Sequence, residues 1–204
     1  MWPPPGRSNP AALRAGAVVR SGKTLGMTRA SPLVVVSGAP GTGKSSVAAA
    51  LAEDLRRPLF SLDTVKEALA DSLGLGDEAW SDRLGDAAAA VIFTLAEANP
   101  WAILEGWWRR ERRERVIERF PGAVEVFCHC HGTLAQDRMR ARHQAGRHPI
   151  HRDVINPAIL DRVAELTDTV TPLGLGASLL ELDTNADLDR VALVAWVRRA
   201  FSGE

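Results

Sequence analysis

Gly38-Ala39-Pro40-Gly41-Thr42-Gly43-Lys44-Ser45 decides the fold, because this stretch matches the pattern G-x-x-x-x-G-K-[ST] of a phosphate-binding loop. The apolar run 33–37 precedes the stretch and the apolar-rich run 47–55 follows it, which predicts a buried strand, a loop and a helix. Glycines allow the backbone to fold tightly around a phosphate group and to turn successive N–H groups inward. The positive end of the predicted helix would face the same phosphate.

This loop predicts a nucleotide site with a role for each polar side chain. The Lys44 ammonium can reach the outer phosphates, and the Ser45 hydroxyl is a candidate magnesium ligand. We expect the nucleotide to contact Gly38, Pro40, Gly41, Thr42, Gly43, Lys44, Ser45 and Ser46. The alternative, a glycine-rich turn that binds nothing, agrees poorly with the lysine, because the chain has 22 arginines and only 3 lysines.

Length, charge and cysteine content limit the classes of protein to which this chain can belong. The 204 residues suit one α/β domain, and 25 basic and 25 acidic residues give no overall charge that would favour nucleic acid or a membrane. No apolar run approaches the roughly 18 residues of a membrane span. The two cysteines, Cys128 and Cys130, are too close in sequence for an ordinary structural disulfide to be assumed. We therefore expect a reducing, cytoplasmic setting. Residues 1–30 have no acidic residue and read as a flexible extension of a 31–204 domain.

Strand and helix patterns alternate along the domain. Strands are predicted at 33–37, 59–62, 101–105, 124–129 and 178–182, with helical patterns between them and after the last. This alternation predicts a three-layer α/β/α sandwich with a five-stranded parallel sheet. Ligands of such sheets bind beyond the carboxyl ends of the strands, where the phosphate loop already lies.

Asp63 follows the second predicted strand at this same edge. Its carboxylate could orient a hydroxyl of a second substrate and accept the proton of that hydroxyl. Asp63 could also, or instead, cap the helix expected to start at Thr64. Lys66, one turn later, is a candidate contact for an anionic group, with a plain surface lysine as the alternative.

Glu105 ends the third predicted strand and is a candidate for the magnesium shell, together with Ser45. The following Gly106 permits close approach of a ligand. Trp107 and Trp108 could form a wall of the second substrate's pocket, with Trp107 as the candidate contact, and the equal alternative is that one of the two is a core residue.

Three arginines form a second constellation. Arg138 and Arg142 are four residues apart on a predicted helix and so share a face, and Arg147 follows a glycine shortly after them. Positive charge on a closing lid, here expected over about 131–155, suits transfer of a phosphoryl group. The alternative is a solvated basic helix.

The run Cys128-His129-Cys130-His131 offers few ligands to one zinc ion, because neighbouring strand residues face opposite ways.

The chain resembles the small P-loop kinases related to gluconate kinase, chloramphenicol phosphotransferase, zeta toxin and the kinase domain of polynucleotide kinases, a kinase-like group of AAA-type P-loop domains. The resemblance spans about 33–201. It is carried by the phosphate loop and by Ser-Leu-Asp-Thr-Val-Lys (61–66), Ile-Leu-Glu-Gly (103–106), Asp-Arg-Met-Arg-Ala-Arg (137–142), Gly-Arg-His-Pro (146–149) and Leu-Asp-Thr (182–184). The group usually has aspartate where this chain has Glu105.

The resemblance implies the fold of the nucleoside monophosphate kinase-like proteins, ATP with Mg²⁺ as the phosphoryl donor, Asp63 as base, and a lid carrying Arg138 and Arg142. We therefore expect an ATP-dependent phosphotransferase that acts on a hydroxyl of a small molecule, with Lys44, Asp63, Arg138 and Arg142 as catalytic residues. Substrate contacts are expected from Asp63, Lys66, Trp107 and Arg147. The alternatives are a polynucleotide 5′-hydroxyl kinase and a nucleotide-dependent ATPase or switch that acts through a protein partner.

Overall fold

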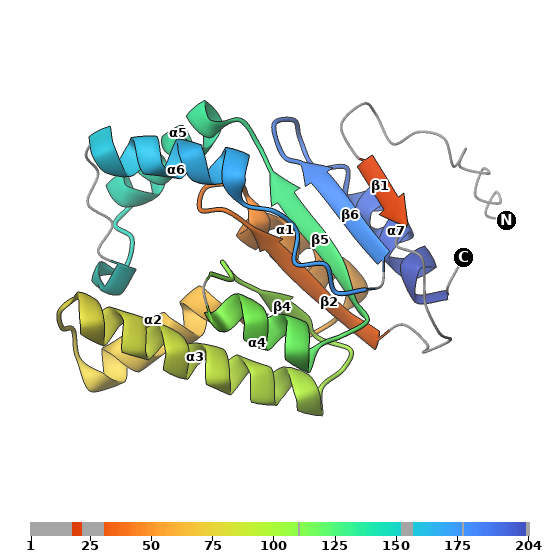
Figure 1. Ribbon diagram of the computed structural model, residues 1–204, viewed down its shortest axis with the longest axis horizontal. Coiled ribbons are helices and arrows are strands. Elements are labelled where there is room, and N and C mark those ends of the chain that lie inside the picture. Colours follow the sequence, from red (N-terminus) through yellow and green to blue (C-terminus); the bar gives the residue numbers. More distant parts are fainter. Residues whose placement is uncertain (1–17, 22–30, 110, 152–156, 177, 203–204) are drawn as a thin grey trace, which may run out of the picture.

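A six-stranded sheet forms the centre of the protein (Figure 1). The computed structural model describes residues 18–21, 31–109, 111–151, 157–176 and 178–202. Five strands are parallel and lie in the order β3-β4-β2-β5-β6, which confirms the predicted parallel sheet. Their bounds are β2 Ser31–Gly38, β3 Leu59–Ser61, β4 Ile103–Glu105, β5 Ala123–His129 and β6 Ser178–Asp183.

The sixth strand, β1 (Val18–Ser21), was not predicted from the sequence. It pairs antiparallel with β6 and so adds an edge to the sheet. The prediction of a flexible extension otherwise falls on residues 1–17 and 22–30, which lie outside the described residues.

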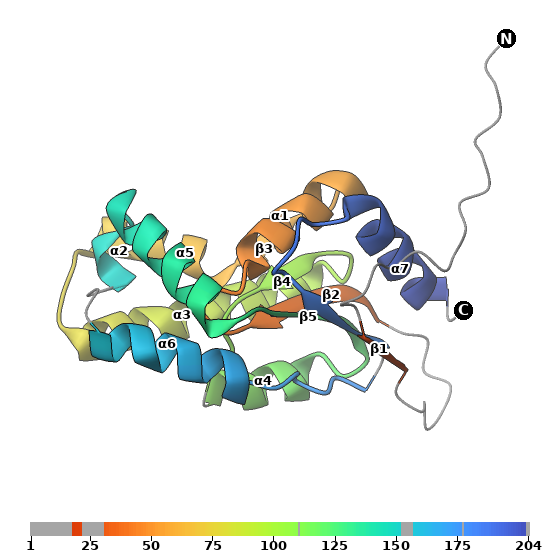
Figure 2. The same ribbon diagram turned by 90° about the horizontal axis from the view of Figure 1, so that it is seen from above.

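Helices cover both faces of the sheet, so the fold has the three layers expected (Figure 2). Helices α1 (Lys44–Leu55) and α7 (Arg190–Ser202) cover one face, and α3 (Glu78–Ala98) and α4 (Glu111–Arg119) cover the other. Four further elements lie around the carboxyl end of the sheet: α2 (Leu62–Leu73), α5 (Gly132–Gln144), the 3₁₀ turn η1 (Pro149–His151) and α6 (Pro157–Thr169). No described helix combines the length and the apolar character needed to span a membrane.

The central strand β2 shows why the sequence builds two packed faces. Side chains alternate along a strand, so Leu33 and Val35 pack with α3 and α4, whereas Val34 and Val36 pack with α1 and α7. These four side chains are at most 1% exposed. A strand that is apolar on both faces is typical of a parallel sheet covered on both sides.

The boundaries of two helices bear on the site, and the start of α2 differs from the prediction. Helix α1 ends at Leu55, and Arg56 then adopts a left-handed backbone (φ 52°) two residues before Pro58. Helix α2 starts at Leu62 rather than Thr64, with Ser61 at the N-cap, so Asp63 lies in the first turn and does not cap the helix. Its carboxylate is therefore available for contacts outside the helix.

Candidate active site

The phosphate loop is built on glycines that no other residue could replace without strain. Gly41 and Gly43 have φ angles of 83° and 78°, in the left-handed region that disfavours a side chain. A Cβ atom at Gly41 would lie 2.6 Å from the carbonyl oxygen of Ala135, and one at Gly38 would lie 2.4 Å from that of Cys128. The loop is therefore packed directly against the end of β5 and the start of α5.

Helix α1 begins at Lys44, directly after the loop, so its free N–H groups and positive end point at the loop. Thr42 Oγ1 donates a hydrogen bond to the carbonyl oxygen of Ala39 (2.8 Å), and Lys44 Nζ lies 3.4 Å from the same oxygen. Lys44 is buried and faces the cradle. This arrangement is that of a phosphate site, as predicted.

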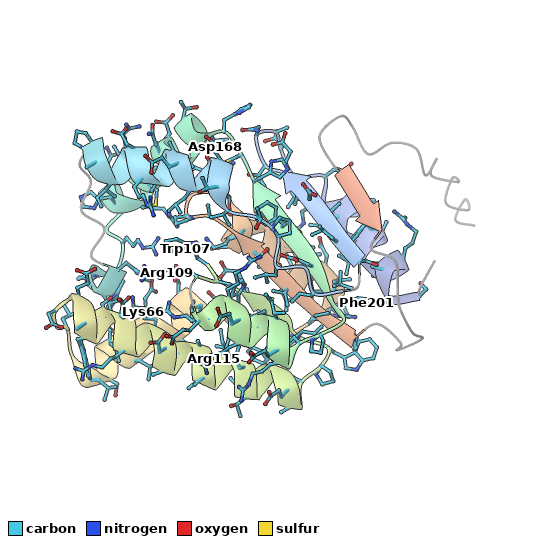
Figure 3. The ribbon with its side chains drawn as sticks, in the orientation of Figure 1. Lys66, Trp107, Arg109, Arg115, Asp168 and Phe201 are labelled. Atoms are coloured by element: carbon cyan, nitrogen blue, oxygen red, sulfur yellow. The ribbon has the colours of Figure 1, made fainter. Side chains whose placement is uncertain are left out.

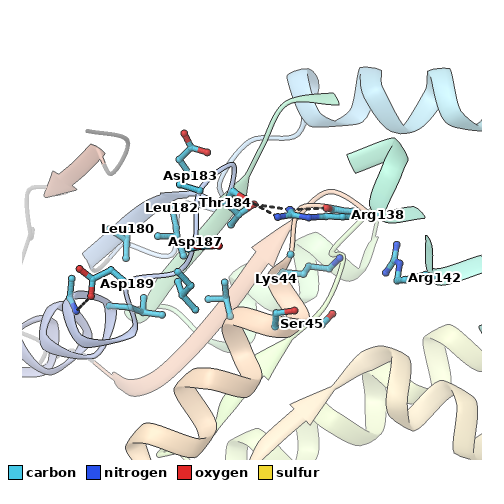
Figure 4. Close-up of a pocket in the computed structure, with 18 of the residues that line it drawn as sticks. Lys44, Ser45, Arg138, Arg142, Leu180, Leu182, Asp183, Thr184, Asp187 and Asp189 are labelled. Atoms are coloured by element: carbon cyan, nitrogen blue, oxygen red, sulfur yellow. Dashed lines mark hydrogen bonds between the residues drawn. The ribbon is translucent and has the colours of Figure 1, made fainter. Parts of the chain in front are cut away.

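A cleft of about 870 Å³ opens beside the loop (Figure 4). Gly41 and Gly43 of the loop and residues 44–47 at the start of α1 form its floor, and Arg138, Ala141 and Arg142 of α5 form one wall. The opposite wall comes from the end of β6, the loop after it and the start of α7, and combines four leucines (Leu180, Leu182, Leu188 and Leu193) with three aspartates (Asp183, Asp187 and Asp189). Leucines beside a phosphate cradle suit a nucleotide, whose base is flat and apolar on its faces and whose phosphates are charged.

Thr184, just after β6, connects three parts of this cleft. Its hydroxyl lies 2.8 Å from the carbonyl oxygen of Thr42 and 3.2 Å from that of His129. Arg138 reaches across to Thr184, with Nη1 3.1 Å from the hydroxyl and Nη2 2.8 Å from the carbonyl oxygen, and also donates to the carbonyl oxygen of Gly41 (3.3 Å). Arg138 is thus held against the phosphate loop by its bonds to Thr184 and Gly41.

Glu105 lies at the end of β4, between the strands that carry the loop and Asp63. Its carboxylate is 2% exposed and accepts hydrogen bonds from Ser45 Oγ (3.1 Å) and Ser61 Oγ (2.8 Å). The predicted pair of magnesium residues therefore meets directly. A hydroxyl and a carboxylate are oxygen donors that fit Mg²⁺, and the remaining positions would be filled by phosphate oxygens and water.

The zinc alternative finds no support in the described part of the chain, where no group of three or more potential metal-ligating side chains occurs. Cys128 and Cys130 are both buried and free. Burial raises the pKa of Cys128 to about 12, so its thiol is protonated at neutral pH.

A second cleft, of about 320 Å³, lies between α2 and the segment that follows α5. Asp63 is half-buried there, and Arg147 Nη2 donates to its Oδ2 at 2.9 Å. The cleft is lined by Ser45, Ser61, Asp63, Thr64, Glu67, Arg142, Ala145, Gly146 and Arg147. The structure therefore brings together two residues predicted to bind the second substrate, although they lie 84 positions apart.

The charge state of Asp63 follows from its surroundings. Burial by itself would raise the pKa of Asp63. Nearby positive charges outweigh burial and hold the pKa below its usual value; they belong to His151, Lys44, Arg147 and Arg142. Asp63 is therefore ionised at neutral pH and can accept a hydrogen bond from a hydroxyl.

Two other predicted substrate residues lie outside the residues that line this cleft. Lys66 Nζ donates to Ser81 Oγ of α3 (2.8 Å), and the Trp107 ring stacks beneath the Arg109 guanidinium at 5.1 Å (Figure 3). Of the two adjacent tryptophans, Trp108 is the core residue: it is 5% exposed and packs against Phe93. Substrate contacts from Lys66 and Trp107 remain predictions.

Sequence reasoning missed one buried carboxylate that supports the loop. Glu125 of β5 accepts hydrogen bonds from Ser37 Oγ (2.7 Å) and from the backbone N–H groups of Leu173 (2.8 Å) and Gly174 (3.1 Å). Burial raises the pKa of Glu125, although these hydrogen bonds oppose the shift. Ser37 immediately precedes the phosphate loop, so Glu125 ties the loop's strand to the segment before β6. A single acidic residue inside the apolar stretch 124–128 was the available signal.

The fold and the loop define a P-loop nucleotide-binding protein of the nucleoside monophosphate kinase-like type. Residues 33–164 match the model of the family described as "AAA domain" (AAA_33), and the chain belongs to this family. Comparison with curated proteins gave no match.

Solved structures support the same fold. A protein of Chloroflexus aurantiacus described as a "putative kinase" is 34% identical, with a TM-score of 0.72; the match covers 82% of this chain and 97% of that one. A gluconokinase from Sinorhizobium meliloti is 20% identical (TM-score 0.54, 86% of this chain and 94% of that one). A shikimate kinase from Bacteroides thetaiotaomicron is 18% identical (TM-score 0.54, 82% and 94%). The last two show likeness of fold.

Proposed function

We propose that the protein is an ATP-dependent kinase that transfers the γ-phosphoryl group of Mg·ATP to a hydroxyl group of a small molecule. One observation supports this most directly: the large cleft and the small cleft share Ser45 and Arg142. A nucleotide in the first cleft would present its terminal phosphate at this shared boundary, and an acceptor in the second would meet it there. The resemblance to the 34% identical "putative kinase" agrees with this function.

In this reaction the protein holds charge around the migrating group. Lys44 contacts the outer phosphate oxygens, and Arg138 and Arg142 approach from the lid, so that the charge developing on the phosphoryl group is neutralised in a sheltered site. Ser45 and Glu105 would hold magnesium, which supplies further positive charge to the β- and γ-phosphates when bound.

Asp63 would act on the acceptor. Its carboxylate accepts a hydrogen bond from the acceptor hydroxyl and orients the oxygen in line with the γ-phosphorus. The new O–P bond forms as the bond between the γ-phosphorus and the oxygen bridging to the β-phosphate breaks. The hydroxyl proton passes to Asp63 and from there to water, and ADP leaves with the former bridging oxygen.

The test is acceptor-dependent formation of ADP by the full chain. Sugars, nucleosides, aminoglycoside-like and chloramphenicol-like compounds and a 5′-hydroxyl oligonucleotide are each added to the protein with Mg·ATP. We expect one class of small molecule to stimulate ADP release and to appear phosphorylated by mass spectrometry. Stimulation by the oligonucleotide alone, or ATP hydrolysis that depends only on a protein partner, would contradict the proposal.

Glu105→Gln tests the magnesium shell through binding. The amide keeps the shape of the side chain and can still bond to Ser45 and Ser61, but it carries no charge. We expect the affinity for Mg²⁺ in the presence of ADP to fall by about 10- to 100-fold, measured by calorimetric titration. Glu105→Asp, which keeps the charge, should lose less. Equal Mg²⁺ affinity in wild type and Glu105→Gln would remove Glu105 from the metal site.

A further inference from the structure

The segment Gly146–His151 after α5 is docked onto α2 and α3 by a buried apolar side chain. Ile150 of η1 is 1% exposed and packs against Ala70 and Leu84, with Trp80 beside it. Its carbonyl oxygen accepts a hydrogen bond from Ser81 Oγ of α3 at 2.8 Å. Figure 1 shows η1 lying next to the ends of α2 and α3, away from the rest of the lid.

Polar side chains of the same segment meet a row of acidic residues on α2. Residues four apart share a face of a helix, which aligns Asp63, Glu67 and Asp71. Each contacts one basic residue: Arg147 Nη2 lies 2.9 Å from Asp63, His151 Nε2 lies 2.6 Å from Glu67, and His148 Nε2 lies 3.0 Å from Asp71. The side of the segment that faces α2 therefore matches the row in position and gives each carboxylate a polar partner.

Helix α5 itself has a separate attachment. Ala135 and Met139 pack against Leu160 and Val163 of α6, and Arg138 is bonded to Thr184. The nucleotide cleft uses residues of α5 up to Arg142, whereas the small cleft is also lined by 145–147. Release of the Ile150 anchor would therefore open the small cleft and leave the wall of the nucleotide cleft in place.

We propose that Ile150 and His151 are positioning residues for the acceptor: their docking on α2 and α3 places Arg147 against Asp63 and completes the acceptor half of the active site. Neither residue lines the small cleft, so each acts through Arg147 and Asp63. This inference rests on the proposed kinase function for its kinetic consequences, but the docking can be measured without an acceptor.

The contact of His151 makes docking depend on pH. Burial lowers the pKa of His151 below its usual value near 6.5; the charges of Asp63 and Glu67 on α2 oppose this shift, and Arg147 in its own segment adds to it. The docked segment therefore takes up a proton less readily than the released segment. Docking is at full strength above about pH 6.5 and weakens as the pH falls below that value. Asp63 stays ionised through this window, because its own pKa lies below 3.8.

The first experiment compares Ile150→Ala with Ile150→Val. Removing most of a buried side chain weakens packing far more than removing one methyl group. In Ile150→Ala we expect amide hydrogen exchange over 146–151 to rise by about tenfold or more, with ATP affinity unchanged. The KM of the acceptor found by ADP release should rise by about tenfold, with a smaller change in kcat. In Ile150→Val, both the exchange over 146–151 and the acceptor KM should stay close to the wild-type values.

The second experiment measures the pH profile of His151→Gln. Glutamine can still donate an N–H group to Glu67 but does not titrate. In wild type, the protection factors over 146–151 (intrinsic exchange rate divided by observed rate, which removes the pH dependence of amide exchange itself) and kcat/KM for the acceptor should both fall as the pH drops below about 6.5. Both profiles should be flat in His151→Gln.

The outcomes separate the two proposals. The positioning role is overturned if amide exchange over 146–151 is unchanged in Ile150→Ala. It is also overturned if wild type and His151→Gln show the same change with falling pH, whatever the acceptor is. Increased exchange with an unchanged acceptor KM also overturns it. If no compound stimulates ADP release, the kinase function fails, whereas the exchange measurements still decide whether Ile150 and His151 dock the segment.

Discussion

Asp63→Asn should lower turnover by about a thousandfold and leave ATP binding unchanged, because a positioned base contributes on the order of 10²–10⁴ to such a step. The amide has nearly the same shape but can neither take up the hydroxyl proton nor pair with the charge of Arg147. Asp63 does not line the nucleotide cleft, so binding of ATP should be unaffected. Single-turnover phosphate transfer and calorimetric ATP binding measure the two effects separately.

Asp71→Asn is the matched control for this variant. It removes the same charge from the same face of α2 and also weakens a contact with the segment 146–151, here with His148. Asp71 is absent from the residues that line the small cleft, so the control should lose little turnover. Equal losses in the two variants would assign the effect to docking of this segment, and full activity of Asp63→Asn would remove Asp63 from the reaction.

Lys44→Ala should lose both ATP binding and phosphate transfer. The side chain has one long hydrogen bond within the loop, to Ala39, so the fold should tolerate its removal. The nucleotide would lose the nearest fixed positive charge on its outer phosphates. We expect kcat/KM for ATP to fall by about 10²- to 10³-fold, the scale seen when one charge-stabilising donor is removed from an active site.

Lys66→Ala supplies the comparison, since Lys66 is the other described lysine and lies outside the nucleotide cleft. It should bind ATP as the wild type does. Near-normal ATP affinity of Lys44→Ala would contradict the predicted loss of binding. A circular dichroism spectrum showing that this variant is unfolded would contradict the expectation that the fold tolerates the substitution.

The parts of the structure that the sequence predicted are those set by local patterns. The positive φ angles of Gly41 and Gly43 follow from the loop motif, and the apolar run from Leu33 places β2 at the centre of the sheet. The parallel sheet and the three layers follow from alternating strands and helices, whereas the order of the strands was not predicted. The pairing of Ser45 with Glu105 follows as well, because adjacent parallel strands end at the same edge.

Contacts between distant segments could not be predicted in the same way. Thr184 bonds to Thr42 across 142 positions, and the motif Leu-Asp-Thr (182–184) marks this threonine without indicating which segment it contacts. The start of α2 at Leu62 follows from tertiary packing of that side chain in the core, which overrides the expected cap at Asp63. The docking of Ile150 likewise depends on a cavity made by two helices from elsewhere in the chain.

The boundary that the two clefts share at Ser45 and Arg142 has a consequence for inhibition. The two clefts adjoin at these two side chains, so a single compound could span both. Joining two ligands makes the second binding event intramolecular, which raises affinity well above that of either part when the connector has the right length. An adenosine polyphosphate joined to an acceptor analogue should therefore be a tight bisubstrate inhibitor. The number of phosphates in the compound that binds best would indicate the distance between the nucleoside and the acceptor in their clefts.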